Sequence, residues 1–181
     1  MDISQAIILA IIEGVTEFLP ISSTGHMILA ADLLGIAESN FLKSFEIIIQ
    51  LGAILAVCLM YLKFLLKNPK IWIKLIVAFL PTAIVGLVLY KYIKMYLLGN
   101  TAVVLWSLFI GGVILIVWEY MFSNYVKRGN ERQGFGIEHL SFKRLFVVGV
   151  FQSLSVVPGV SRAAATIIGA MSVGLSRRAA V

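Results

Sequence analysis

The chain contains three long apolar runs, residues 47–62, 75–92 and 97–119, in which charged side chains occur only near the ends. A helix needs about 20 apolar residues to cross the hydrocarbon core of a bilayer, and lysines at its ends extend its reach toward the interface. Only 13% of the residues are charged, whereas a typical soluble domain has about 25%. We therefore predict an all-α integral membrane protein with three membrane spans, built as one polytopic helical bundle over residues 1–181.

Two further apolar regions, residues 3–35 and 145–175, are interrupted in the middle. The first is broken by PISSTG at Pro20–Gly25, and the second by PGVSR at Pro158–Arg162. Each half is too short to cross the membrane, so each region is predicted to enter and return as a re-entrant helix hairpin. Broken helices are tolerated at membrane depth only where protein or a water-filled cavity satisfies the backbone, which is where binding sites form.

The two broken regions share a spacing that suggests distant copies of one unit. The matched positions are Glu13, Ser22 and Gly35 in the first region and Gln152, Ser161 and Gly174 in the second. The connections 63–74 and 124–144 are rich in lysine and arginine, which predicts that both are cytoplasmic. The hairpins then enter from opposite sides and bring their tips together near the midplane, the arrangement of an inverted repeat.

The first break carries a dense group of polar side chains. Glu13 and Glu17 are four residues apart and therefore share one helix face. The hydroxyls of Ser22–Thr24 and the N–H groups of a new helix form a candidate anion or phosphate site. Ser23 and His26 also share a face, so His26 is a candidate base for a Ser23 nucleophile. The alternative is that the hydroxyls only satisfy backbone groups and that His26 packs in the core.

The second break supplies a cation. Arg162 is the one charged residue of region 145–175, and Ser161 and Thr166 are close to it. A guanidinium beside helix N–H groups suits a phosphate, and a divalent metal held by Glu13 and Glu17 would bridge to the same phosphate. The alternative is an arginine that pairs with a buried carboxylate for architecture alone.

Gln50 is a candidate supporting residue, because it is an uncharged polar side chain inside an apolar run. A packing hydrogen bond next to Gly52 explains it equally well.

The net charge of +6 does not indicate nucleic-acid binding, because the basic residues form short clusters between apolar runs. The single cysteine, Cys58, lies within an apolar run and excludes an intramolecular disulfide. The N-terminus lacks the basic segment that a cleavable signal peptide needs.

Together these motifs resemble the undecaprenyl-diphosphatase family, also called bacitracin-resistance proteins. The resemblance rests on EGVTEFLPISSTGH at Glu13–His26, on FEIIIQLG at Phe45–Gly52, and on PGVSR at Pro158–Arg162 followed by Thr166. It implies hydrolysis of membrane-embedded undecaprenyl diphosphate to the monophosphate, which recycles the lipid carrier for peptidoglycan and confers bacitracin resistance. It also implies a divalent cation (Mg²⁺ or Ca²⁺) and a site that opens toward the outer face of the bacterial cytoplasmic membrane.

Position by position, the resemblance assigns Glu13 and Glu17 as the acidic pair, Ser23 as the nucleophile, His26 as its histidine and Arg162 as the phosphate-holding arginine. Two departures stand out. Ala163–Ala164 replaces a Ser-Gly pair, and family chains continue beyond residue 181, so the C-terminal part of the second repeat is expected to be missing.

Two alternatives stay open. A polyprenyl-phosphate transporter or flippase has the same inverted-repeat architecture, and self-association as a homodimer is not decided by sequence. The type 2 phosphatidic acid phosphatases are disfavoured, because neither a histidine nor an aspartate follows Arg162.

Overall fold

The computed structural model describes residues 1–97, 100–127 and 140–181, and the side chains of residues 123–127 are left out of that description. Every regular element in the described part is a helix, and three helices are long and apolar enough to cross a membrane. The prediction of an all-α membrane protein is confirmed. Much of the basic connection 124–144 lies outside the described residues.

The three long helices overlap the three predicted spans but have different ends. They are α3 (Asn40–Lys67), α4 (Pro69–Val88) and α6 (Thr101–Lys127). The α3 helix begins after Ser39, whose hydroxyl accepts a hydrogen bond from the Leu42 N–H at 3.1 Å. It ends at Lys67, and its C-cap Asn68 lies directly before Pro69, a residue type favoured at the first position of the next helix.

The segment between α4 and α6 differs most from the prediction. The α4 helix stops at Val88 and is followed by a short helix α5 (Tyr90–Tyr92) and one π-helical turn η1 (Ile93–Leu97). The Asn100 side chain accepts a hydrogen bond from the Val103 N–H at 3.3 Å, which caps the start of α6. The cap explains why α6 begins at Thr101, later than the predicted span, whose residues 98–99 lie outside the description.

Each interrupted region forms two short helices. The first consists of α1 (Ile3–Thr16) and α2 (Ser23–Leu33). The second consists of α7 (Phe142–Ser153), a 3₁₀ turn η3 (Leu154–Val156) and α8 (Arg162–Ser172), followed by α9 (Arg177–Ala180). The helices that follow the two breaks are built alike: both have 11 residues, and serines at equivalent places, Ser22 and Ser161, cap them. The inverted repeat and the re-entrant placement stay predictions.

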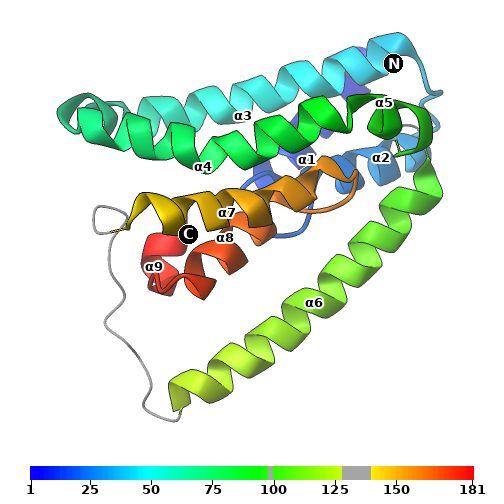
Figure 1. Ribbon diagram of the computed structural model, residues 1–181. Coiled ribbons are helices and arrows are strands. Elements are labelled where there is room, and N and C mark those ends of the chain that lie inside the picture. The colour runs from blue at the N-terminus through cyan, green and yellow to red at the C-terminus, as the bar shows by residue number, and fades with distance from the viewer. Residues whose placement is uncertain (98–99, 128–139) are drawn as a thin grey trace.

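The two hairpins meet beside a pair of antiparallel helices. Figure 1 shows α3 and α4 side by side, the α1–α2 hairpin reaching inward from the end marked N, and the α7–α8 hairpin reaching inward from the opposite end. The α7 helix packs on α4 so closely that a Cβ on Gly149 would lie 2.1 Å from the Ala78 carbonyl oxygen. The α6 helix diverges from the other elements along its length.

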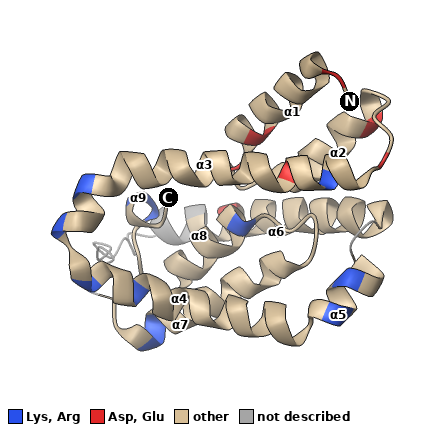
Figure 2. Cartoon of the chain, turned by 90° about the horizontal axis from the view of Figure 1, so that it is seen from above, with Lys and Arg blue, Asp and Glu red and all other residues tan. Residues whose placement is uncertain are grey.

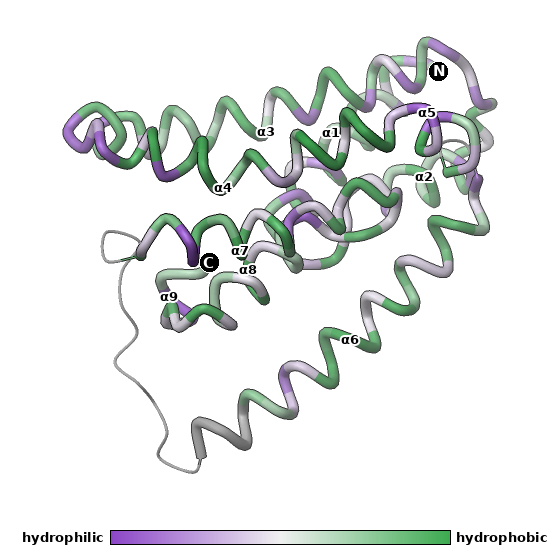
Figure 3. The backbone as a smooth tube through the Cα atoms, in the orientation of Figure 1, coloured by the Kyte–Doolittle hydropathy of each residue, from purple (hydrophilic) through white to green (hydrophobic). Residues whose placement is uncertain are grey.

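The long helices consist mostly of apolar residues, as the hydropathy colouring of the backbone in Figure 3 shows, and many of their large apolar side chains are exposed. Lysines and arginines gather where α3 meets α4 and near α9, and a second basic group lies at α5 (Figure 2). This distribution is that of a helical membrane protein, with an apolar belt between charged ends.

Candidate active site at the two helix breaks

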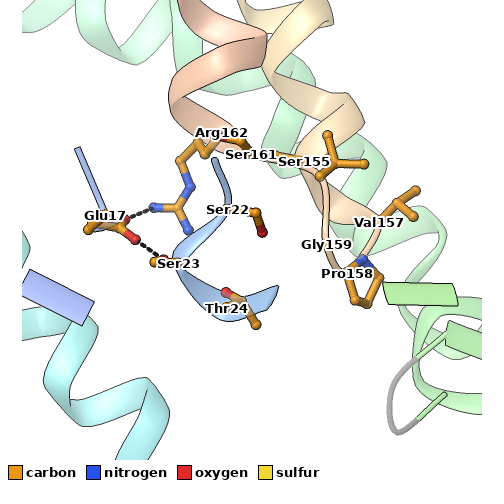
Figure 4. Close-up of a pocket in the computed structure, with 11 residues that line it drawn as sticks. Glu17, Ser22, Ser23, Thr24, Ser155, Val157, Pro158, Gly159, Ser161 and Arg162 are labelled. Atoms are coloured by element: carbon orange, nitrogen blue, oxygen red, sulfur yellow. Dashed lines mark hydrogen bonds and ion pairs between the residues drawn. The ribbon is translucent and has the colours of Figure 1, made fainter. Parts of the chain in front are cut away.

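A polar pocket of about 60 Å³ lies where the tips of the two hairpins meet (Figure 4). Its lining comes from both breaks, which are far apart in the sequence. The lining residues are Glu17, Ser22, Ser23, Thr24, Ser155, Val157, Pro158, Gly159, Val160, Ser161 and Arg162. The structure therefore brings together the two motifs that the sequence identified separately.

The first break places two serines at the pocket through an unusual turn. Among the described residues, Ser22 is the one non-glycine residue with a left-handed backbone, at φ 64°. Such a conformation costs about 1–3 kcal/mol and persists only where the surroundings impose it. The Ser22 hydroxyl accepts a hydrogen bond from the Gly25 N–H at 3.4 Å and thereby caps α2. As a result Ser23, which is 6% exposed, becomes the first residue of the new helix.

Glu17 connects Ser23 to the second break. The Ser23 hydroxyl donates a hydrogen bond to Glu17 Oε2, and Glu17 Oε1 lies 3.9 Å from Arg162 Nη1. Both contacts are drawn as dashed lines in Figure 4. The Glu17 side chain is 14% exposed, whereas that of Arg162 is 53% exposed. A serine, a carboxylate and a guanidinium from two distant motifs thus form one chain of contacts.

The ion pair does not exhaust the capacity of Arg162. A guanidinium carries five N–H donors in a planar fork, and the contact with Glu17 engages one nitrogen at the long end of the ion-pair range. The remaining donors face a pocket that also receives the start of α8. A purely architectural pair explains the contact with Glu17 but not the 53% exposure of the Arg162 side chain at the pocket.

Glu13 lies one helical turn before Glu17 and is 1% exposed. Within the described part of the chain, neither of its carboxylate oxygens has a hydrogen-bond partner. A buried carboxylate without a partner is costly, so it takes up a proton or a cation. Carboxylate oxygens are the ligands that Mg²⁺ and Ca²⁺ prefer, so the donor set fits such an ion.

The acidic pair does not form a complete metal site alone. No group of three or more His, Cys, Asp or Glu side chains is gathered in the described ranges. Mg²⁺ is commonly held by one or two carboxylates together with substrate phosphates and water, and this is the arrangement that Glu13 and Glu17 suit.

In the described part of the chain, His26 makes its hydrogen bond with the backbone of Ser22 and none with the Ser23 hydroxyl. Its Nδ1 lies 2.9 Å from the Ser22 carbonyl oxygen, an acceptor that fixes the ring with a proton on Nδ1 and leaves Nε2 available. The Ser23 hydroxyl is directed to Glu17 instead. Helical side chains tilt toward the N-terminus of their helix, so His26 meets the carbonyl four residues earlier while Ser23 points past the helix start. His26 lines a second, apolar cavity.

Of the two predicted residues beside Arg162, Ser161 lies at the polar pocket and Thr166 does not. Ser161 lines the polar pocket and caps α8 by accepting a hydrogen bond from the Ala164 N–H at 3.2 Å. Thr166 is not among the residues lining the pocket, and its hydroxyl donates to the Arg162 and Ala163 carbonyl oxygens at 2.9 and 3.0 Å.

Gln50 does reach the site, because its Nε2 donates a hydrogen bond to the Thr24 hydroxyl oxygen at 3.4 Å. Ser155 also lines the pocket, with its hydroxyl donating to the Gln152 carbonyl oxygen at 2.7 Å. Sequence reasoning missed Ser155. Its only signal was a position three residues before Pro158, and a lone serine there does not stand out without the fold.

An apolar groove of about 490 Å³ adjoins the polar pocket. Residues of α2, α6, α7 and α8 form its walls, among them Leu29, Leu108, Leu115, Phe151 and Ile168. Ser22, Gly159, Val160 and Ser161 line both cavities. The polar pocket therefore opens beside a space suited to an apolar chain.

Two glycines allow α6 to pack against both breaks. Gly159 has φ 90°, and a Cβ there would lie 2.7 Å from the Val104 carbonyl oxygen. A Cβ on Gly25 would lie 2.8 Å from a methyl group of Leu108. The first half of α6 is thus a common wall for the two tips.

Comparison with known proteins places these features in a family. Residues 6–181 match the family model described as bacitracin resistance protein BacA. The chain is 50% identical over 176 residues to the undecaprenyl-diphosphatase of Aquifex aeolicus, covering 97% of this chain and 66% of the relative. It is 47% identical over 180 residues to that of Bdellovibrio bacteriovorus, covering 99% and 66%, so it spans about two thirds of their length. The chain belongs to the BacA family of bacitracin resistance proteins.

Proposed function

We propose that the site at the two helix breaks hydrolyses undecaprenyl diphosphate to undecaprenyl phosphate and inorganic phosphate. The relatives in Aquifex aeolicus and Bdellovibrio bacteriovorus are named undecaprenyl-diphosphatases. The observation that carries the proposal is the contact chain from Ser23 through Glu17 to Arg162 across the two motifs. It combines a hydroxyl, a base and an anion-binding cation at one pocket.

The terminal phosphate of the substrate would bind between the two helix starts. Arg162 would donate hydrogen bonds from its guanidinium, and the first N–H groups of α2 and α8 would add their partial positive charge. Ser22, Thr24 and Ser161 line the same pocket and would contribute hydroxyl contacts. The Thr166 hydroxyl would contact the phosphate only after leaving the carbonyl oxygens of its own helix.

In the covalent route, Ser23 Oγ attacks the terminal phosphorus while Glu17 accepts the serine proton. The bond from that phosphorus to the bridging oxygen breaks, and undecaprenyl phosphate leaves with the electron pair. Water then hydrolyses the phosphoserine, which restores the Ser23 hydroxyl and releases inorganic phosphate. The imidazolium form of His26 is proposed to donate its Nε2 proton to the leaving group, since Nδ1 is engaged with the Ser22 carbonyl. Nε2 then takes a proton back from the water that attacks the phosphoserine, and Glu17 returns the serine proton to Ser23. In the alternative route Glu17 activates water directly.

We further propose that Glu13 and Glu17 hold a divalent cation, Mg²⁺ or Ca²⁺. Such an ion supplies charge neutralisation for the phosphate oxygens. Support comes from the two Glu13 oxygens, which lack a hydrogen-bond partner within the described residues.

The apolar groove is the proposed binding place for the isoprenoid tail, because it adjoins the polar pocket along a shared edge. The basic connections 63–74 and 124–144 support only the cytoplasmic placement of these two loops. We further propose that the protein lies in the bacterial cytoplasmic membrane with its site toward the outer face, as the family resemblance implies. There the reaction would recycle the lipid carrier for peptidoglycan and confer bacitracin resistance.

A transporter needs no hydroxyl nucleophile held by a carboxylate, so the Ser23–Glu17 hydrogen bond favours hydrolysis over the alternative of a polyprenyl-phosphate transporter.

The test uses the purified chain and undecaprenyl diphosphate, with phosphate release measured in micelles and lipid movement measured in vesicles. Phosphate release is the expected result. Lipid movement without phosphate release would contradict the proposal.

A further inference from the structure

Gln50 makes a hydrogen bond that joins a long membrane helix to the active-site pocket. It lies within α3, where its neighbours Ile47, Ile48 and Leu51 are exposed apolar side chains. Its Nε2 donates to Thr24 Oγ1, in the first turn of α2. Placing an amide in an apolar helix is unfavourable unless it is hydrogen-bonded, and the partner of this amide is a hydroxyl that lines the polar pocket.

The direction of this hydrogen bond determines what Thr24 can do. A hydroxyl has one proton and two lone pairs. The Gln50 N–H occupies a lone pair of the Thr24 oxygen and cannot accept the Thr24 proton. The proton is therefore available to another acceptor, and the pocket beside it is the proposed place of the substrate phosphate.

Other threonines of the two hairpins differ from Thr24 in this respect. Thr16 donates its proton to the Ile12 carbonyl oxygen at 2.6 Å, and Thr166 donates to the Arg162 carbonyl oxygen at 2.9 Å. Both hydroxyls are engaged by their own helix. For Thr24, the described part of the structure records a hydrogen bond that it accepts and none that it donates.

We propose that Gln50 is a positioning residue that orients the Thr24 hydroxyl to donate a hydrogen bond to the phosphate. This inference rests on the proposed function, because it needs a phosphate in the polar pocket. It gives Gln50 an effect on binding that depends entirely on the Thr24 hydroxyl. A packing role for Gln50 predicts an effect that is independent of that hydroxyl.

The test is a double-mutant cycle on the full chain, with inorganic phosphate as the probe and binding measured by titration. Thr24→Val removes the hydroxyl at nearly constant shape and should weaken phosphate binding about tenfold, the value of one hydrogen bond to a charged group. Gln50→Leu should weaken it about threefold to tenfold in the wild-type background. In the Thr24→Val background Gln50→Leu should change it by less than about twofold.

Three further variants control the cycle. Thr24→Ser retains the hydroxyl and should restore the effect of Gln50→Leu. Gln50→Met, which keeps the length of the side chain, replaces Gln50→Leu if that variant loses its fold by circular dichroism. Ser44→Ala removes a hydroxyl of α3 that donates to its own helix, at the Asn40 carbonyl, and should leave binding unchanged.

Equal effects of Gln50→Leu with and without the Thr24 hydroxyl would overturn this inference and leave the proposed function intact. The same conclusion would follow if the wild-type chain binds phosphate and Gln50→Leu alone leaves the affinity for phosphate unchanged. The proposed site and the inference would both be overturned by two results together. The wild-type chain would fail to bind phosphate, and Arg162→Ala would leave the rate of phosphate release from undecaprenyl diphosphate unchanged.

Discussion

Glu17 Oε1 and Arg162 Nη1 lie 3.9 Å apart, although Glu17 follows α1 and Arg162 is the first residue of α8. The pair joins the tips of the two hairpins and places a carboxylate that accepts the Ser23 proton beside a cation. Two short motifs, neither of which is a site alone, become one site through this contact.

Replacing Ser23 distinguishes the two chemical routes. If Ser23 is the nucleophile, Ser23→Ala should lower the rate of phosphate release from undecaprenyl diphosphate by about a thousandfold or more. Ser172→Ala is the matched control, because that hydroxyl donates to the Ile168 carbonyl within α8. Retention of most of the rate in Ser23→Ala would eliminate the covalent route and favour direct attack by water.

Replacing Glu13 tests the proposed cation site. Glu13→Gln keeps the shape but removes the charge, so the Mg²⁺ concentration needed for half-maximal phosphate release should rise about tenfold or more. The measurement is a metal titration of the purified variant after treatment with a chelator. Glu38→Gln is the control, since Glu38 is exposed and pairs with Lys43. An unchanged Mg²⁺ requirement in Glu13→Gln would remove Glu13 from the metal site.

Replacing Gly159 tests the contact between α6 and the second break. Gly159→Ala places a methyl group 2.7 Å from the Val104 carbonyl oxygen at a left-handed backbone position. The free energy of unfolding in detergent should therefore fall by about 1–3 kcal/mol. Gly14→Ala is the matched control, because a Cβ there meets nothing within 4 Å and alanine favours a helix. Equal thermal midpoints for the two variants would contradict the packing of α6 on this turn.

Much of the fold follows from hydrophobicity and from the two prolines. Apolar runs bounded by lysines predict long helices, and α3 and α4 follow them because burial in lipid requires every backbone group to be satisfied within the helix. The breaks at Pro20 and Pro158 separate short helices, since a proline after a helical run ends it. The length of an apolar run and the position of a proline can both be read from a short stretch of sequence.

The contacts within the site depend on geometry that is not local. The spacing of Ser23 and His26 suggested a base next to the nucleophile, yet the left-handed turn at Ser22 directs Ser23 toward Glu17. The tilt of helical side chains directs His26 to a backbone carbonyl. Thr166 similarly donates to its own helix. The sequence identified the groups, but the turn and the packing between hairpins decide which of them meet.

The most direct test of the account compares two arginines that have similar exposure and a similar partner. Arg162 is 53% exposed and pairs with Glu17 in the pocket, whereas Arg177 is 59% exposed and pairs with Glu119 away from it. Phosphate release from undecaprenyl diphosphate should fall about a hundredfold or more in Arg162→Ala and stay near the wild-type rate in Arg177→Ala. Equal rates in Arg162→Ala and the wild type would contradict a phosphate site at the meeting point of the two breaks.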